Sequence, residues 1–259
     1  DTCQSKRDFF CSTEELTGRY IIIYRSANDM VMVGDPCHLR QMFYGHVGNN
    51  VVVTSSVKLF LASFKLTPKI NPEKKEFINS DIYRSKHALW YGDQTMDDRL
   101  RRLLANHYLD VQSATPYRLP VTVIVPTNDE DAVIAYSKNI LENTFEALLK
   151  QYKLMLAVTA GVDSRALLAA SRKYQDQIDY YILHDKDTDP SDISVSTDLT
   201  KKLGIKFSVI PIAPLRQDFI EKFSAEYVEP IVQPGLVHIQ HYYDQKYDST
   251  TLNVNGTAA

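Results

Sequence analysis

The sequence predicts an α/β protein of two units, because two different patterns of strand and helix follow one another along its 259 residues. In residues 18–56, short runs rich in Ile, Val, Tyr and Met alternate with the turn-like segments SANDM, GDP and GNN, which is typical of antiparallel hairpins. From residue 154 onward, strand candidates alternate with helix candidates, which is typical of a parallel sheet covered on both faces. A chain of this length has room for two packed units.

The antiparallel half is expected to carry helices as well as hairpins. A helix is predicted over residues 57–64, and a more polar helix after Pro72, since proline suits the first turn of a helix. Residues 97–104 are basic and contain leucines, so we expect a charged helix surface there, with inward-facing Leu100, Leu103 and Leu104. Residues 108–111 and 119–125 are predicted to be extended.

The boundary between the units is predicted near residue 126. The run PTND at residues 126–129 supplies a break and an N-cap. Apolar residues at helical spacing then predict one long helix, whose stripe consists of Ile134, Leu141, Phe145, Leu148 and Tyr152. The predicted domains are therefore residues 1–125 and 126–259.

In the second half, four strands are expected over residues 154–159, 179–184, 207–212 and 251–255. Helices are expected over residues 165–174, 193–203 and 215–227, with a weaker candidate after residue 235. In parallel sheets of this kind, ligands sit at the carboxyl ends of the strands, where the strand order reverses. The segment TAGVDS, residues 159–164, lies at one such strand end.

The TAGVDS loop has the properties of an anion site. A loop between a strand and the next helix presents free backbone N–H groups and the positive end of the helix dipole. Gly161 allows close approach of a ligand to the backbone, Ala160 and Val162 leave N–H groups available, and Thr159 and Ser164 can donate hydroxyl hydrogen bonds.

Asp163 is the exception, because its carboxylate would repel a phosphate unless a cation lay between them. A Mg²⁺ ion bridging carboxylate and phosphate oxygens resolves this conflict, so the loop suggests a metal–pyrophosphate site. The loop lacks the pattern GxxxxGK[ST] and is not that of a γ-phosphate-transferring NTPase. An alternative stays open: Asp163 or Ser164 caps the helix, and Gly161 makes the turn.

Residues 159–164 resemble the SGGxDS loop of N-type ATP pyrophosphatases, specifically the synthetase domain of glutamine-dependent asparagine synthetases and their relatives, β-lactam synthetases and lasso-peptide cyclases. Ser191-Asp192, followed by a helix ending Lys-Leu-Gly, resembles the second helix of that domain, and Asn255-Gly256 its second glycine-rich nucleotide loop.

The first half resembles the glutaminase-like domain of the same enzymes. The matching segments are Gly18-Arg19-Tyr20 opening a strand, Gly34-Asp35-Pro36 with Arg40 and Tyr44 after it, and Ser55-Ser56-Val57-Lys58 at a strand-to-helix junction. Residues 91–111 resemble the linker into the synthetase domain. The resemblance thus covers nearly the whole chain.

The resemblance implies an incomplete Ntn-hydrolase-like antiparallel sheet domain, followed by a doubly wound parallel-sheet ATP pyrophosphatase domain of the PP-loop, adenine nucleotide alpha hydrolase-like type. It implies an ATP-dependent carbon–nitrogen ligase with ATP and Mg²⁺ as cofactors. On this resemblance, the enzyme would adenylate a carboxylate, release pyrophosphate and form an amide, with aspartate to asparagine as the expected reaction. Its partners would be a small-molecule carboxylate and an amine or ammonia, and a homodimer is a further expectation.

The same resemblance implies roles for individual residues. Asp163 would hold the metal. Val158 and Leu183, at strand ends, would line the adenine pocket. The ATP and pyrophosphate would be bound by Thr159, Ala160, Gly161, Val162, Asp163, Ser164 and Gly256.

The sequence departs from the family at both ends. The glutaminase nucleophile of the family is an N-terminal cysteine, whereas residue 1 here is Asp1, and Cys3 is acylated on its nitrogen by Thr2. The family's acidic pair after the second glycine loop is missing after Gly256. We therefore expect an internal fragment that hydrolyses no glutamine and retains ATP binding better than turnover, and we assign no catalytic residue.

Two alternatives remain. A relative that forms an internal amide, as β-lactam synthetases and lasso-peptide cyclases do, would need no glutaminase nucleophile. A catalytically inactive nucleotide-binding or scaffold homologue would keep the fold without the missing acidic residues.

The composition limits the partners. A formal net charge of −3 and a pI near 6.2 give no general attraction to nucleic acid or anionic lipid. No run approaches the roughly 18 apolar residues of a membrane helix, and residues 1–20 are too polar for a signal peptide, so a cytoplasmic location is expected. The spacing of Cys3, Cys11 and Cys37 predicts reduced, structural thiols.

Four other groups have two readings each. His238 and His241 could bind a metal, but a packed helix face is favoured. Asp185, Asp187, Asp189 and Asp192 could bind a cation, but a solvated loop with Asp192 as an N-cap is favoured. Arg99, Arg101 and Arg102 could touch nucleic acid, but a charged surface is favoured. Arg40 could bind a carboxylate or form a structural ion pair.

Overall fold

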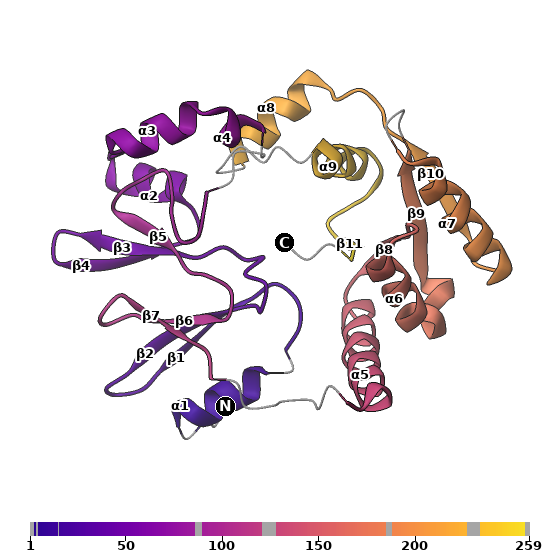
Figure 1. Cartoon of the computed structure of the whole chain (residues 1–259), viewed down its shortest axis with the longest axis horizontal. Helices are drawn as coiled ribbons and strands as arrows, with labels where there is room; N and C mark the ends of the chain where they lie inside the picture. Colours follow the sequence, from indigo (N-terminus) through magenta and orange to yellow (C-terminus); the bar gives the residue numbers. More distant parts are fainter. Residues whose placement is uncertain are drawn as a thin grey trace. The chain divides into compact units, whose positions relative to one another are not determined.

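The computed structural model describes residues 3, 5–14, 16–85, 90–120, 128–184, 188–226 and 234–256 (Figure 1). The chain divides into two compact units: unit 1 contains Asp1–Ile124 with Glu221–Val232 and Ala259, and unit 2 contains Val125–Ile220 with Gln233–Ala258. The division after Ile124 lies next to the boundary expected from the PTND run, of which residues 126 and 127 fall outside the described part. Residues 221–232, expected in the second domain, group with unit 1.

Unit 1 contains two antiparallel sheets. The first has the order β1-β2-β6-β7 and is formed by Ile21–Arg25, Met30–Gly34, His107–Asp110 and Thr115–Arg118. The second has the order β4-β3-β5 and is formed by Asn50–Thr54, Phe43–Val47 and Leu100–Arg102. The hairpins predicted in residues 18–56 are thereby confirmed as β1-β2 and β3-β4.

The two sheets of unit 1 pack face to face between two helices. Residues from both sheets share one buried cluster, which includes Tyr44 of β3 and Leu109 of β6. Helix α1 (Lys6–Thr13) covers the outer face of the first sheet through Phe9 and Phe10, and α2 (Val57–Phe64) covers the second sheet through Phe60. Because side chains alternate along a strand, each sheet has two apolar faces and unit 1 has four layers.

Helices α3 (Pro72–Asn79) and α4 (Asp81–Ser85) follow in unit 1. Pro72 occupies the first turn of α3 as predicted, and the Asn71 side chain caps the helix by accepting a hydrogen bond from the Lys74 N–H at 2.8 Å. Ser56 caps α2 in the same way, accepting from the Leu59 N–H at 3.0 Å.

The helix expected in residues 97–104 is wrong, because the middle of this segment, Leu100–Arg102, forms the edge strand β5 and no residue of the segment is helical. Pairing with β3 is so close that a Cβ added to Gly45 would lie 1.9 Å from the Arg99 carbonyl oxygen. Leu100 and Leu103 are buried as expected, but Leu104 is 38% exposed. A long-range strand contact has overridden the local helical pattern.

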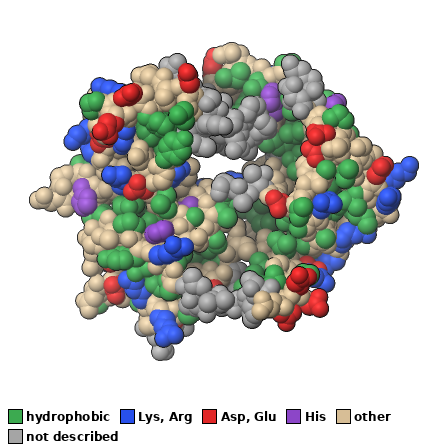
Figure 2. All heavy atoms as spheres, viewed as in Figure 1, with side chains coloured by type: hydrophobic (Ala, Val, Ile, Leu, Met, Phe, Trp, Pro, Cys, Tyr) green, Lys and Arg blue, Asp and Glu red, His purple; other side chains and the backbone are tan. Residues whose placement is uncertain are grey.

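The basic side chains of this segment are held by the protein itself. Arg99 pairs with Asp97 at 2.6 Å, Arg101 pairs with Asp93 at 3.2 Å, and Arg102 donates to the Gly92 carbonyl oxygen at 2.9 Å. On the face drawn in Figure 2, basic and acidic side chains of the described residues are interspersed without a continuous basic patch. The charged-surface reading of these arginines is therefore favoured.

The buried Asp97 carboxylate is expected to make the stability of unit 1 fall at acidic pH. The carboxylate is fully buried, and although burial alone raises its pKa, hydrogen bonds from the Arg99 side chain and from the Lys69 and Arg99 N–H groups bring the pKa below its ordinary value. The stability that this charge contributes is therefore complete above the unfolded-state pKa of about 4 and is lost as the pH falls through the lower folded-state pKa.

Replacing Asp97 by asparagine should lower the free energy of unfolding at pH 7 by about 2 kcal/mol, because hydrogen bonds to a buried charge are lost. It should also flatten the pH dependence below about pH 4. The single tryptophan, Trp90, lies in unit 1 and is buried, so urea unfolding followed by its fluorescence measures both effects. An equally steep acid limb in the variant would contradict the assignment.

Unit 2 contains one parallel sheet with the order β10-β9-β8-β11, formed by Phe207–Pro211, Ile178–His184, Lys153–Ala157 and Thr251–Val254. The chain moves outward from β8 through β9 to β10 and then returns to the other side of β8 as β11. The strand order therefore reverses between β8 and β11. The predicted sequence of antiparallel sheets followed by a parallel sheet is confirmed.

Helices cover both faces of this sheet. One face packs against α5 (Glu130–Leu149), α6 (Val162–Ser171) and α7 (Pro190–Lys202), with Phe145 and Leu168 at its centre. The other face packs against α9 (Pro234–Lys246) through Ile239 and Tyr242. The short helix Arg172–Gln177 leads into β9, and α8 (Gln217–Glu226) follows β10.

The long predicted helix is α5, and Asp129 caps it by accepting a hydrogen bond from the Ala132 N–H at 2.9 Å. Its predicted stripe is only partly buried. Phe145 is 2% exposed and Leu141 and Leu148 pack beside it, but Ile134 is 63% exposed and Tyr152 lies beyond the helix end. The sheet is shorter than the helix, so only the C-terminal half of α5 meets it.

Candidate nucleotide site

The TAGVDS loop connects β8 to α6 at the edge of the sheet where the strand order reverses. Asn255 and Gly256 follow β11, the neighbour of β8, and therefore lie at the same edge. A Cβ added to Gly256 would lie 2.8 Å from the Asp163 Cβ, 2.9 Å from the Asp163 carbonyl carbon and 3.0 Å from the Ser164 nitrogen. Gly256 and Asp163, 93 positions apart in the sequence, thus meet with no room for a side chain at Gly256.

The N-terminus of α6 is open. Its N-cap is Gly161, in an extended conformation with φ −65° and ψ 150°, and no side chain of the described residues caps it. Asp163 and Val162 are exposed, the latter by 71%. The alternative in which Asp163 or Ser164 caps the helix is therefore not observed, and any residue could adopt the backbone conformation of Gly161.

Two hydroxyl groups close the loop on itself. The Ser164 side chain is buried, and its Oγ accepts a hydrogen bond from the Thr159 N–H at 3.0 Å and lies 3.1 Å from the carbonyl oxygens of Thr159 and Gly161. The Thr159 Oγ1 accepts from the Gly161 N–H at 3.1 Å. The loop is thereby held in shape by its own hydroxyls, and the outward-facing groups are the first turn of α6 and the Asp163 carboxylate.

Asp192 holds the loop from outside. Its Oδ1 accepts a hydrogen bond from the Ala160 N–H at 2.8 Å, across 32 positions of sequence. The prediction that Asp192 is an N-cap is wrong: Asp189 caps α7 by accepting from the Ser191 N–H at 2.8 Å, and Pro190 follows it. Asp192 then lies in the first turn of α7, facing the loop. Asp185 and Asp187 fall outside the described residues.

Removing the Asp192 carboxylate should loosen the loop without removing an exposed ligand group. Asp192→Ala leaves the Ala160 N–H without its acceptor, so the free energy of unfolding of unit 2 should fall by about 1 kcal/mol. Asp192→Asn keeps an amide oxygen that can accept the same hydrogen bond, so its free energy of unfolding should fall by less. Chemical unfolding followed by circular dichroism tests the order; equal losses in both variants would mean that the charge, and not this hydrogen bond, matters.

A cavity of about 190 Å³ adjoins the loop at the carboxyl ends of β8 and β9. Leu183, expected in an adenine pocket, lines it. Val158 does not line it, because its side chain is fully buried and packs with Leu168; its expected contact with adenine stays a prediction. The lining residues are Ala157, Thr159, Tyr181, Ile182, Leu183, Thr188 and Asp192.

The described residues contain no group of three or more His, Cys, Asp and Glu side chains that could hold a metal ion. His241 is 3% exposed, and its ring centre lies 4.9 Å from that of Phe219. Its Nε2 lies 2.9 Å from the Gln245 amide nitrogen. The packed-face reading of His238 and His241 is favoured over a metal site.

The turn Gly34-Asp35-Pro36 in unit 1 is built around a buried carboxylate. Asp35 is 1% exposed and accepts hydrogen bonds from the N–H groups of Leu39 and Arg40, each at 2.9 Å. No ion pair of Arg40 occurs among the described residues, so the structural ion pair considered for it is not observed. Cys3, Cys11 and Cys37 are free thiols, as expected.

No family model matches the chain, and no curated protein matches it. Among solved structures, the chain is distantly similar to glutamine-dependent NAD+ synthetase from Acinetobacter baumannii in complex with ADP, with 8% sequence identity and a TM-score of 0.29. The similarity covers 85% of this chain and 55% of that chain. Within the described ranges, no helix combines the length and apolar character needed to cross a bilayer.

Proposed function

We propose that unit 2 binds Mg·ATP at the edge where β8 and β11 end, and that the chain belongs to an asparagine-synthetase-like, AMP-forming amide ligase. One observation carries the proposal: the open N-terminus of α6 and Gly256 lie together where the strand order reverses. A reversal of strand order leaves a crevice at the carboxyl ends of the strands, which is the usual ligand position in open parallel sheets.

In the proposed complex, the pyrophosphate portion of ATP lies against the first turn of α6. The N–H groups of Val162, Asp163 and Ser164 start the helix with no side-chain cap, so they and the helix dipole would bind anionic oxygens. Thr159, Ala160 and Gly161 would contribute by shaping the loop. Gly256 would bring the backbone after β11 to the same oxygens. The adenine would occupy the cavity beside Leu183.

The residues present suit a magnesium ion. Asp163 offers an exposed carboxylate beside the anion-binding turn. Mg²⁺ is usually bound by one or two carboxylates together with substrate phosphates and water, so a fully protein-built cage is not needed. Bound there, the ion would neutralise charge on the departing pyrophosphate. The N–H groups of α6 would stabilise the same charge from the protein side.

The acceptor is proposed to be a small carboxylate that takes the adenylyl group, after which an amine or ammonia displaces AMP. Aspartate is the proposed acceptor, and an intramolecular amide, as in β-lactam synthetases and lasso-peptide cyclases, is the alternative. A homodimer is proposed on the resemblance alone.

A second candidate is a nucleotide-binding or scaffold homologue without turnover. It is favoured by the closed hydrogen-bonding of the loop: the Ala160 N–H is taken by Asp192, the Gly161 N–H by Thr159, and the Ser164 hydroxyl by loop carbonyls. Such a loop offers fewer donors to a phosphate than its sequence suggests.

Calorimetric titration of ATP into the protein, with and without Mg²⁺, tests nucleotide binding. Metal-dependent binding supports the proposal, and absence of binding by the folded protein contradicts it. Pyrophosphate release in the presence of aspartate and ammonia then separates the two candidates: release supports the ligase, whereas binding without release supports the scaffold.

A further inference from the structure

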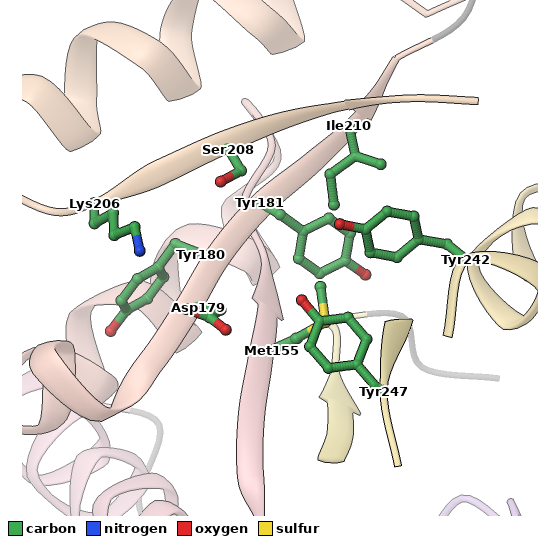
Figure 3. Close-up of a pocket in the computed structure, with 9 residues that line it drawn as sticks. All are labelled: Met155, Asp179, Tyr180, Tyr181, Lys206, Ser208, Ile210, Tyr242 and Tyr247. Carbon is green, nitrogen blue, oxygen red and sulfur yellow. The ribbon is translucent and has the colours of Figure 1, made fainter. Parts of the chain in front are cut away.

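A second cavity, of about 170 Å³, lies on the α9 face of the unit 2 sheet (Figure 3). Its volume is close to the roughly 150 Å³ of an engineered cavity that holds benzene, so it suits a ligand of about six or more non-hydrogen atoms. The cavity is lined by Met155, Asp179, Tyr180, Tyr181, Lys206, Ser208, Ile210, Tyr242 and Tyr247. It shares only Tyr181 with the cavity beside the TAGVDS loop.

The floor of the cavity is unusually polar for a parallel sheet. Strands of such sheets are normally apolar on both faces. Here Asp179 lies beside Met155 in the register, and Ser208 lies beside Tyr181, on the face that α9 covers. Lys206 comes directly before β10, whose first residue pairs with the neighbour of Asp179. A carboxylate, a hydroxyl and an ammonium group thus lie on adjacent strands.

These polar groups have no partners among the described residues. Asp179, Lys206 and Ser208 are exposed, and none of their side chains forms a hydrogen bond or an ion pair there. Opposite charges on neighbouring strands commonly pair with each other, yet Asp179 and Lys206 do not. The two charges are therefore available to a molecule that carries both signs.

The other side of the cavity is aromatic. Figure 3 shows the rings of Tyr181, Tyr242 and Tyr247 gathered around Met155, across from Asp179 and Ser208. The rings of Tyr242 and Tyr247 are 6.0 Å apart, and the Tyr181 hydroxyl is held by Asn253 at 2.8 Å. Burial, then Tyr242 and then Asp179 raise the pKa of Tyr247 to about 12, so its phenol stays neutral. The aromatic side offers apolar surface without added charge.

The charged side chains around the cavity disfavour a ligand that carries a charge of only one sign. A simple cation over the aromatic rings would be repelled by Lys206 and by the Lys246 ammonium, which lies 5.4 Å from the Tyr242 ring centre. A simple anion would meet the Asp179 carboxylate. A molecule with both charges avoids both conflicts, because each of its ends faces an opposite charge.

We propose that this cavity binds a small α-amino acid as its zwitterion, with the ammonium group at Asp179, the carboxylate at Lys206 and the side chain against the tyrosines. The site is separate from the proposed nucleotide site, and its test does not depend on ATP.

The test uses three probes of similar size: L-alanine, L-alaninamide, which lacks the carboxylate, and N-acetyl-L-alanine, which lacks the ammonium group. Binding is followed by NMR of ¹³C-methyl-labelled methionine, because Met155 is buried in the cavity wall and is one of only five methionines. Met155→Leu assigns its signal. L-Alanine should shift this signal in a saturable way, and each blocked probe should bind about three- to fivefold more weakly, as expected for the loss of one exposed ion pair.

Two variants identify the partners. Lys206→Met should weaken the binding of L-alanine to the affinity of L-alaninamide for the unmodified protein. Asp179→Asn should weaken it to the affinity of N-acetyl-L-alanine. The matched control Lys201→Met on α7 should leave the affinity for L-alanine unchanged. The proposal is overturned if no probe shifts the Met155 signal, if either blocked probe binds as tightly as L-alanine, or if both variants bind L-alanine like the unmodified protein.

Discussion

Replacing Asp163 by alanine is expected to abolish Mg²⁺-dependent ATP binding while the protein remains folded. Asp163 is exposed in the first turn of α6 and caps nothing, so the free energy of unfolding should change by no more than about 0.5 kcal/mol. The carboxylate is the only acidic group that the proposal places against the metal. Calorimetry should therefore show at least about a 100-fold loss of Mg·ATP affinity, equivalent to roughly 2.7 kcal/mol.

The matched control is Asp198→Ala, which removes an exposed carboxylate from α7. Its ATP affinity should equal that of the unmodified protein. The metal requirement gives a second check, since the weak residual binding of Asp163→Ala should no longer depend on Mg²⁺. Unchanged, metal-dependent affinity in Asp163→Ala would remove the central claim about this loop.

Gly256→Ala should damage the same site by a different route. The added Cβ would lie under 3.0 Å from both the Cβ and the carbonyl carbon of Asp163, and backbone cannot move aside as a flexible side chain can. The start of α6 must therefore shift away from the segment after β11. We expect the ATP affinity to fall at least about tenfold, and the free energy of unfolding of unit 2 to fall by about 1–3 kcal/mol from overpacking.

Gly161→Ala is the matched comparison within the loop. Gly161 has an ordinary extended backbone, and its added Cβ would meet only the Thr159 Oγ1, at 3.1 Å. The free energy of unfolding of Gly161→Ala should therefore stay close to that of the unmodified protein. If ATP binding falls in Gly161→Ala without a stability loss, a ligand itself approaches this backbone; equal destabilisation in both variants would show that Gly256 has no special contact.

Much of the architecture could be predicted because it depends on local pattern. The hairpins of unit 1 and the parallel strands of unit 2 follow from runs of β-branched residues separated by turns. The meeting of Gly256 with Asp163 also follows once the strand order reverses, since neighbouring parallel strands end at the same edge. The roles of these residues in binding remain predictions.

The misassigned features depend on contacts that a sequence pattern does not contain. A helix is expected over residues 97–104, but pairing with β3 makes Leu100–Arg102 a strand. Val158 and Ala157 are adjacent at the end of a strand and face opposite sides of the sheet, so a sequence pattern alone does not tell which of them lines the cavity beside the loop. The sequence pattern predicts Asp192 as a helix cap, whereas its hydrogen bond from the Ala160 N–H depends on how α7 lies beside the loop.

The pairing of β11 with β8 has a consequence for folding while the chain is being synthesised. Because β8 is synthesised about a hundred residues before β11, it must wait at the edge of a three-stranded sheet with one row of backbone groups unpaired. Contacts of such large sequence separation form slowly, after the loop-closure entropy has been overcome. During translation, the edge of β8 is thus open to pairing with another chain, and pairing with β11 both completes the sheet and ends that exposure.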